Sequence, residues 1–247
     1  MAERKCHKNE KYILSFGAGV NSTALLVFLI NNNYPLHEVV FADTGGEVPE
    51  TYKHLKIVDS YLRKHEISFK IVKSKNGTLY ETCMRRRVTP SQVWRWSTRD
   101  YKITPIHTHY RSLKAHVNQY LGVSYEERNR MKEARVPYIK NIFPLVENRL
   151  TRHDCIDIIC QADFDLPLPV RSGCFFCPFN SLSRWKEIFQ KHRDLYYKAM
   201  LLEENSKHFP KQKLMKFTLR TLQDKLEKKE PLPNIRVKRM CASECII

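Results

Sequence analysis

The sequence predicts an open α/β fold with a doubly wound parallel sheet, followed by a helical, basic C-terminal part. In the N-terminal half, strand, helix, strand, helix and strand patterns follow one another within roughly sixty residues, which implies right-handed crossovers and a sheet covered on both faces. Beyond about residue 180, apolar residues recur at helical spacing. We therefore expect an α/β domain over residues 11–170 and a helical region over residues 171–247.

The first expected strand, residues 12–16, runs into a turn that contains Gly17 and Gly19, and the apolar run 24–30 then forms a helix. Glycines let a backbone approach an anion closely, and a helix N-terminus offers unpaired N–H groups and the positive end of its dipole. The turn therefore indicates a phosphate site. An ordinary strand-to-helix turn that contains two glycines is the alternative.

The second expected strand, residues 38–42, ends in a polar loop that begins Asp43-Thr44-Gly45-Gly46-Glu47. An amphipathic helix over 51–66 and a third strand over 68–72 follow. Open α/β sheets bind ligands at the carboxyl ends of their strands. We therefore expect this loop and the glycine turn to lie at the same edge of the sheet.

These two stretches, SFGAGVNST and FADTGGEVPETY, resemble the phosphoadenosine phosphosulfate (PAPS) reductase family, a branch of the PP-loop ATP pyrophosphatases, also called adenine nucleotide alpha hydrolases. The resemblance implies a Rossmann-like, PP-loop type of sheet that binds ATP or a related adenine nucleotide (PAPS or APS) with Mg2+. The nucleotide-binding residues that it implies are Ser15, Phe16, Gly17, Ala18, Gly19, Asn21, Ser22, Thr23, Asp43, Thr44 and Gly45.

The sequence departs from the phosphate-loop motif SGGxDST of that superfamily at three positions. Gly17 replaces Ser, Ala18 replaces Gly and Asn21 replaces Asp. These changes keep the turn, but they weaken the argument that ATP is cleaved between its α and β phosphates.

Residues 97–106 are similar to the family motif CCxxRKxEPL, in which Lys102 and Pro105 match. Ser97 and Thr98 stand where cluster-bearing members have paired cysteines that bind iron. We expect Arg99 and Lys102 to neutralise phosphate charge, and Asp43 and Glu47 to hold Mg2+ or to position a nucleophile. The predicted catalytic residues are thus Asp43, Glu47, Arg99 and Lys102.

The cysteines form a second signal. Cys174 and Cys177, in RSGCFFCP, have the spacing of a metal knuckle, but zinc or an iron–sulfur cluster usually takes four ligands. Cys241 and Cys245 near the C-terminus would complete the set, and relatives with such a loop tend to have a C-terminal pair. The alternative is a redox pair with Cys245 as nucleophile.

The middle of the chain gives weaker signals. We interpret Cys155 and Cys160 as core cysteines on a helix that begins with a capping box at Thr151, and we expect a strand over residues 139–146. His107, His109 and His116 are interpreted as surface histidines on a helix, with a metal-binding His-x-His pair as the alternative.

The 247-residue chain carries a formal net charge of +17, from 43 Lys and Arg against 26 Asp and Glu. Such a surplus favours RNA or DNA as a partner, or reflects a generally Lys-rich surface. One candidate surface is C-terminal and comprises Lys211, Lys213, Lys216, Arg220, Lys225, Lys228, Lys229, Arg236, Lys238 and Arg239. The other is Arg85-Arg86-Arg87 with Trp94-Arg95-Trp96, although tryptophans that pack against the sheet from a mobile loop are the favoured interpretation there.

No apolar window is long enough to span a membrane and the N-terminus lacks a signal-peptide core, so we expect a cytoplasmic protein without a membrane partner, and a homodimer is a candidate assembly. The first functional hypothesis is ATP-dependent sulfur or group transfer, with a nucleic acid as one candidate acceptor. The alternatives are a thiol-dependent PAPS or APS reductase and a non-catalytic nucleic-acid-binding protein that keeps the nucleotide fold.

Overall fold

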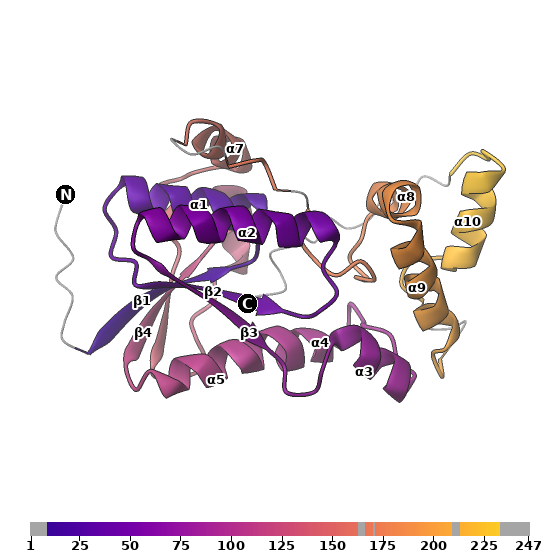
Figure 1. Cartoon of the computed structure of the whole chain (residues 1–247), viewed down its shortest axis with the longest axis horizontal. Helices are drawn as coiled ribbons and strands as arrows, with labels where there is room; N and C mark the ends of the chain where they lie inside the picture. The colour runs from indigo at the N-terminus through magenta and orange to yellow at the C-terminus, as the bar shows by residue number, and fades with distance from the viewer. Residues whose placement is uncertain (1–8, 163–165, 170, 209–212, 233–247) are drawn as a thin grey trace.

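The computed structural model describes residues 9–162, 166–169, 171–208 and 213–232. A five-stranded, all-parallel sheet with the strand order β3-β2-β1-β4-β5 forms its centre (Figure 1). The strands are β1 (Glu10–Phe16), β2 (Glu38–Asp43), β3 (Ser68–Lys73), β4 (His116–Leu121) and β5 (Ile139–Ile142). Helices cover both faces, and this confirms the predicted doubly wound α/β fold.

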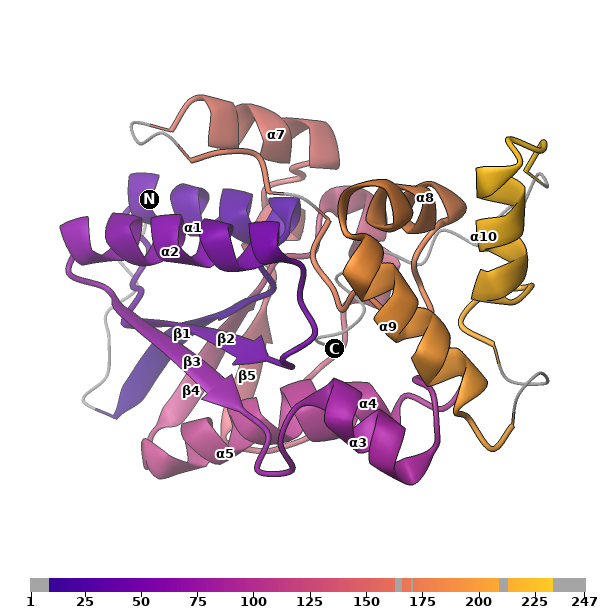
Figure 2. The same ribbon diagram turned by 45° about the vertical axis from the view of Figure 1, so that its right-hand side comes forward.

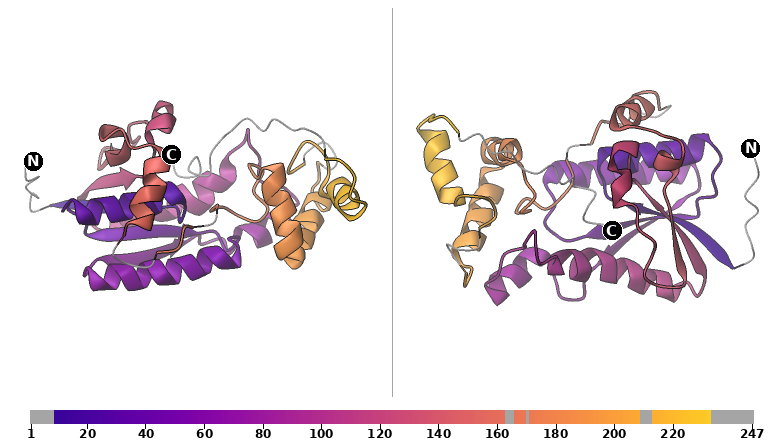
Figure 3. Two further views of the ribbon diagram at one scale, coloured as in Figure 1. Left: turned by 90° about the horizontal axis from the view of Figure 1, so that it is seen from above. Right: turned by 180° about the vertical axis from the view of Figure 1, so that it is seen from behind.

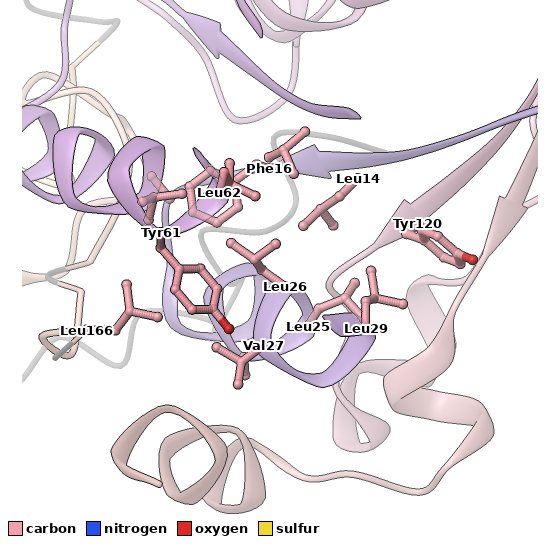
Figure 4. Packing of buried hydrophobic residues seen from close by; sticks show 14 of the residues in the cluster. Leu14, Phe16, Leu25, Leu26, Val27, Leu29, Tyr61, Leu62, Tyr120 and Leu166 are labelled. Atoms are coloured by element: carbon pink, nitrogen blue, oxygen red, sulfur yellow. The ribbon is translucent and has the colours of Figure 1, made fainter. Parts of the chain in front are cut away.

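One face of the sheet is covered by α1 (Val20–Asn31) and α2 (Pro49–Lys64), with α7 (Arg152–Cys160) packed outside α1 (Figures 1 and 3). In the core on this face, Leu25, Leu26 and Leu29 of α1 are fully buried and lie toward Leu14 and Tyr120 of the sheet (Figure 4). The other face is covered by α5 (Thr104–Ser112), whose buried side chains pack against β1, β2 and β4.

The strand β4, which lies between β1 and β5, was not predicted. It carries two buried amides, Asn118 and Gln119, where an apolar pattern would have marked a strand. Asn118 donates to Glu10 Oε2 at 3.2 Å and Gln119 donates to Asn141 Oδ1 at 3.0 Å, so the neighbouring strands satisfy both side chains. The interpretation of His116 as a helical surface residue is wrong, because it begins β4, whereas His107 and His109 do lie on α5.

Three further expectations need correction. The strand expected over 139–146 ends at Ile142, because Pro144 begins the short helix α6 (Pro144–Glu147). Cys155 is buried as expected, but Cys160 is exposed at the end of α7. A helix, α3 (Leu79–Arg86), forms where no periodicity was found, and its Thr78 capping box supplies the signal that was missed.

The predicted capping box of α7 is confirmed. Asp154 Oδ2 accepts a hydrogen bond from the Thr151 backbone N–H at 2.7 Å, and Thr151 Oγ1 accepts one from the Asp154 backbone N–H at 3.3 Å. The remaining short elements are α4 (Trp96–Thr98), the π-helical turn η1 (Arg99–Ile103) and the 3-10 helix η2 (Tyr125–Arg130).

The C-terminal region forms the expected helices, α8 (Leu182–Lys191), α9 (Arg193–Glu204) and α10 (Leu219–Glu227), beside the sheet (Figure 2). Their apolar cluster also contains Leu79 and Cys83 of α3 and Tyr101 of η1. The domain boundary between residues 170 and 171 therefore stays a prediction. In the described part of the chain, no helix is long and apolar enough to cross a bilayer.

Candidate functional site

The glycine turn lies at the carboxyl end of β1, and α1 begins at Val20 with Gly19 as its N-cap. The Gly19 N–H donates to Ser22 Oγ at 3.2 Å, and Ala18 adopts a left-handed conformation with φ 55°. The side chains of Ser15, Phe16, Ala18 and Thr23 are buried. At these four predicted positions, a bound phosphate would therefore meet the backbone rather than the side chain.

The end of β4 lies directly against this turn. A Cβ atom on Gly122 would lie 2.9 Å from the backbone N and Cα atoms of Ser22, so only glycine allows the two backbones to approach this closely. Because β1 leads to β2 on one side and pairs with β4 on the other, this is the topological switch point of the sheet. Ligands bind at such points in open α/β sheets.

Asn21 is buried in a network of charged side chains. Its Oδ1 accepts a hydrogen bond from Arg152 at 3.1 Å and its Nδ2 donates to Glu127 Oε2 at 3.1 Å, while Glu127 also pairs with Arg130 at 3.0 Å. An aspartate would place a second carboxylate against Glu127. The departure from the superfamily motif at this position thus has a local structural reason.

The two predicted acidic residues after β2 are already hydrogen-bonded. Asp43 accepts hydrogen bonds from the Gly45 N–H at 2.8 Å and from the Tyr52 hydroxyl at 3.0 Å, and it pairs with Lys73 at 3.3 Å. Burial and the neighbouring Asp43 carboxylate raise the pKa of Tyr52 above its usual range, so the hydroxyl keeps its proton. The role of Asp43 and Glu47 in holding Mg2+ stays a prediction.

The loop over residues 171–177, which we call the cysteine loop, crosses both the glycine turn after β1 and the loop after β2. The Gly173 N–H donates to Glu47 Oε2 at 2.9 Å, and the Phe175 N–H donates to the Gly46 carbonyl at 2.7 Å. Ser172 Oγ lies 2.9 Å from the position of a Cβ on Gly19. The two strongest sequence signals therefore meet at one edge of the sheet, which the sequence did not predict.

A pocket of about 450 Å3, including a part open to solvent, adjoins this crossing. It is lined by Thr44, Leu79, Pro90, Ser91, Ser97, Thr98, Lys102, Cys174, Cys177, Pro178 and Phe179. Cys174 and Cys177 of the cysteine loop therefore line the same pocket as Ser97 and Thr98. These two residues stand at the positions of the paired cysteines in the motif CCxxRKxEPL. Cys174 is buried, with its Sγ 3.1 Å from Thr44 Oγ1, whereas Cys177 is partly exposed.

The cysteine loop contains a compact turn, since the Cys177 N–H donates to the Cys174 carbonyl at 3.0 Å. Among the residues that the structure describes, no group of three or more His, Cys, Asp or Glu side chains could hold a metal ion. Cys241 and Cys245 lie outside those residues. The four-cysteine ligand set, with zinc or an iron–sulfur cluster, therefore stays a prediction.

A third cysteine lies close to the loop. Burial, and secondarily the neighbouring Cys174, raise the pKa of the Cys83 thiol to about 12. Its side chain is fully buried in the cluster that includes Cys174. Cys83 is therefore a protonated core thiol at neutral pH and not a nucleophile.

The two predicted cations of η1 differ in position. Lys102 lines the pocket. The Arg99 side chain is 69% exposed and its Nε lies 2.7 Å from Asp100 Oδ1. Lys102 thus lies at the pocket, where its role in neutralising phosphate charge stays a prediction, whereas Arg99 is held in a surface ion pair.

A buried histidine of α2, which sequence reasoning missed, contacts the first turn of α1. His54 Nε2 lies 3.0 Å from Thr23 Oγ1, and burial lowers the pKa of His54 to about 4. The imidazole is therefore neutral at physiological pH. His54 lies on the buried side of α2 with Thr51, Leu55 and Val58, and this position in the helical repeat is the sequence signal for its burial.

The prediction that the tryptophans pack against the sheet is wrong for both, because Trp96 packs against the helical cluster that contains Tyr101 of η1, and Trp94 lies in solvent. Trp96 meets Tyr101 edge-on, with ring centroids 6.3 Å apart, whereas Trp94 is 75% exposed. On the C-terminal surface, Arg220 pairs with Glu204 at 2.7 Å and Lys225 with Glu230 at 3.1 Å. The predicted cations Lys211, Arg236, Lys238 and Arg239 lie outside the described residues.

The strand order, the glycine turn at the switch point and the loops after β1, β2 and β4 define an open α/β protein of the nucleotide-binding type. A family model for the phosphoadenosine phosphosulfate reductase domain matches residues 11–147, which is more than half of the chain. The chain belongs to this family, and so to the PP-loop superfamily.

Two solved structures have similar folds. PAPS reductase from Candida auris, in a phosphate complex, is 16% identical with a TM-score of 0.46, over 68% of this chain and 82% of that chain. The U34-tRNA thiolase NcsA from Methanococcus maripaludis, with its [4Fe-4S] cluster, is 14% identical with a TM-score of 0.39, over 79% of this chain and 71% of that chain. No curated protein matched the sequence. Because both TM-scores lie below 0.5, the family assignment rests on the sequence match.

Proposed function

We propose that this protein is an enzyme that binds an adenine nucleotide at the glycine turn and carries out ATP-dependent sulfur or group transfer. The observation that carries the proposal is the crossing of the cysteine loop over both nucleotide loops. A nucleotide whose phosphates lie on residues 17–23 would have its reacting end close to the pocket that holds Cys174, Cys177 and Lys102.

The chemistry would run in two steps. An oxygen of the acceptor attacks the α-phosphorus of ATP, the α–β phosphoanhydride bond breaks, and pyrophosphate leaves. Asp43 and Glu47 would hold the Mg2+ that offsets its charge. A sulfide ion then attacks the activated carbon of the acceptor, the bond from that carbon to the adenylated oxygen breaks, and AMP leaves with that oxygen. Lys102 would offset phosphate charge.

Cys174 and Cys177 would also supply two of the ligands for zinc or an iron–sulfur cluster, with Cys241 and Cys245 as the other two. Metal analysis of the wild type, Cys174→Ser and Cys160→Ser tests this ligand set. Cys160 is exposed on α7 and serves as the matched control. Loss of metal in Cys174→Ser alone supports it, and equal metal content in all three refutes it.

The family match favours a second candidate, a thiol-dependent reductase of PAPS or APS. There, a thiolate such as that of Cys245 attacks the sulfur of the substrate and expels the nucleotide, and a reducing thiol then releases sulfite. The serine and threonine at positions 97 and 98 count against the cluster-bearing form of this reaction.

The deciding experiment is a titration with ATP, APS and PAPS, followed by assays of pyrophosphate and sulfite release. Pyrophosphate release that requires ATP and an added acceptor supports transfer, whereas sulfite release from PAPS or APS with a thiol supports reduction. Binding without turnover would leave only a non-catalytic nucleotide fold. If none of the three nucleotides binds, the proposal is wrong.

Gly19→Ala provides the site-specific control. Its Cβ would lie 2.9 Å from Ser172 Oγ, where the cysteine loop covers the turn. We expect weaker nucleotide binding in this variant with an unchanged melting temperature, because the clash involves a side chain that can rotate. Wild-type affinity in Gly19→Ala would place the nucleotide elsewhere.

A further inference from the structure

The segment over residues 85–96, which we call the Arg–Trp segment, presents an exposed indole. Trp94 is 75% exposed and Val93 is 95% exposed, although Trp185 of the same chain is fully buried. Ser91 Oγ accepts the backbone N–H groups of Val93 and Trp94 at 3.2 and 3.3 Å. The segment therefore forms a hydrogen-bonded turn that holds the indole in solvent.

Arg95, the next residue, has buried guanidinium nitrogens without a partner. Its Nε and Nη2 atoms are shielded from water and make no hydrogen bond within the described residues. A buried cationic donor without a partner is costly, and a phosphate oxygen is well suited to satisfy it. An anion bound beside the exposed indole would satisfy these donors once the Arg95 side chain turns toward solvent.

Positive charge on the same segment is not neutralised. Arg85, Arg86 and Arg87 are exposed at the end of α3. Within the described parts of the chain these arginines form no ion pair, and their contacts are with a hydroxyl, an indole and a backbone carbonyl (Thr82, Trp96 and Asn205). On α10, by contrast, Arg220 and Lys225 are both paired with glutamates. The Arg–Trp segment is therefore the better match for a polyanion.

The segment also forms a wall of the cysteine pocket. Pro90 and Ser91 line the pocket, and Gln92 Nε2 donates to the Pro178 carbonyl at 2.5 Å. A strand bound along the arginines would thus pass the mouth of the pocket that holds Cys174 and Cys177. Aromatic stacking platforms combined with arginines are how proteins bind unpaired bases and their phosphates.

We infer that the Arg–Trp segment binds single-stranded nucleic acid, with Trp94 stacked on a base and Arg95 bound to a phosphate, and that this strand is the acceptor for the pocket. The last clause rests on the proposed function. The binding itself does not, because it requires neither ATP nor turnover.

The test is fluorescence anisotropy with labelled 12-nucleotide single-stranded DNA, the matching RNA and a 12-base-pair duplex, without ATP, over a range of salt concentrations. We expect either single strand to bind more tightly than the duplex, and the tighter one identifies the source. Stacking on one base predicts a roughly 5- to 150-fold loss of affinity in Trp94→Ala, with recovery in Trp94→Phe. Arg95→Gln should weaken binding by roughly tenfold or more and lower the salt slope by about one.

Lys56→Gln, on the exposed side of α2, is the charge-matched control and should bind as the wild type does. Melting temperatures of the Trp94 variants should be unchanged, since Trp94 is largely exposed, and that of Arg95→Gln should not fall, because this substitution removes a buried charge without a partner. The inference is overturned if Trp94→Ala binds as tightly as the wild type, if the duplex is preferred, or if an acidic peptide binds and the oligonucleotides do not.

A second readout separates this inference from the proposed function. If single strands bind through Trp94 but do not stimulate pyrophosphate release, the surface is correct and the acceptor role is wrong. If nucleotides bind but no oligonucleotide does, the surface is wrong and the nucleotide site stands.

Discussion

Replacing Glu47 with alanine should release the cysteine loop from the edge of the sheet. The carboxylate is 6% exposed, and its Oε2 accepts the Gly173 N–H at 2.9 Å. A hydrogen bond to a charged group contributes about 1.5–3 kcal/mol. Because about 1.4 kcal/mol corresponds to a tenfold change in an equilibrium constant, the loop should open roughly 10- to 150-fold more often.

Amide hydrogen exchange read by mass spectrometry on a peptide that covers residues 171–177 measures this opening. Glu47→Gln keeps a neutral acceptor for Gly173, so its exchange should fall between those of the wild type and the alanine variant. Glu230→Ala is the remote control, since Glu230 is exposed and pairs with Lys225. Unchanged exchange of the loop in Glu47→Ala would show that this carboxylate does not hold the loop.

Three further predictions concern buried groups around the site. In the folded state the pKa of His54 is about 4, below its ordinary value of 6.5, so the unfolded chain takes up a proton first as the pH falls. The free energy of unfolding should therefore drop by up to about 3 kcal/mol between pH 6.5 and 4. Urea titrations should show a shallower drop for His54→Asn. Gly122→Ala forces a Cβ against the backbone of Ser22 and should cost about 1–3 kcal/mol in urea unfolding. Maleimide labelling of the native protein should reach the exposed Cys160 and leave Cys83 and Cys155 unlabelled, because burial raises the pKa of both buried thiols to about 12.

Each of these predictions has an outcome that contradicts it. Parallel pH profiles of the wild type and His54→Asn would show that the imidazole is solvated. Wild-type stability of Gly122→Ala would mean that the β4 loop can move away from the turn. Labelling of Cys83 before Cys160 would contradict the buried position of α3.

The first three strands and the glycine-containing turns that follow the first two could be predicted because their signals are local. Residues 12–16 are apolar apart from Ser15, and residues 39–42 are all apolar. Glycines or polar side chains follow both runs at once. The helix over 152–160 was indicated by a capping box that spans the four residues 151–154. Such signals involve residues that are close together in the sequence, so they can be recognised without a structure.

What could not be predicted depends on partners far apart in the chain. The polar residues of β4 do not predict a buried strand from the sequence alone. They are accommodated because Glu10, 108 residues away, accepts a hydrogen bond from the side-chain amide of Asn118. The side-chain amide of Asn21 is explained by its hydrogen bonds to Glu127 and Arg152, which lie 106 and 131 residues away in the sequence. Glu47 and Gly173 meet across 126 residues. The position of the cysteine loop is therefore a property of the fold rather than of either motif.

The strand order also bears on how the chain emerges from the ribosome. β1 pairs with β2 on one side, and these residues leave the exit tunnel early, but its other neighbour, β4, is synthesised about a hundred residues later. During that interval one long edge of an apolar strand has open N–H and C=O groups, which is the kind of edge that pairs with other chains. Fragments that stop before residue 116 should aggregate, and fragments that extend through β5 should remain dispersed.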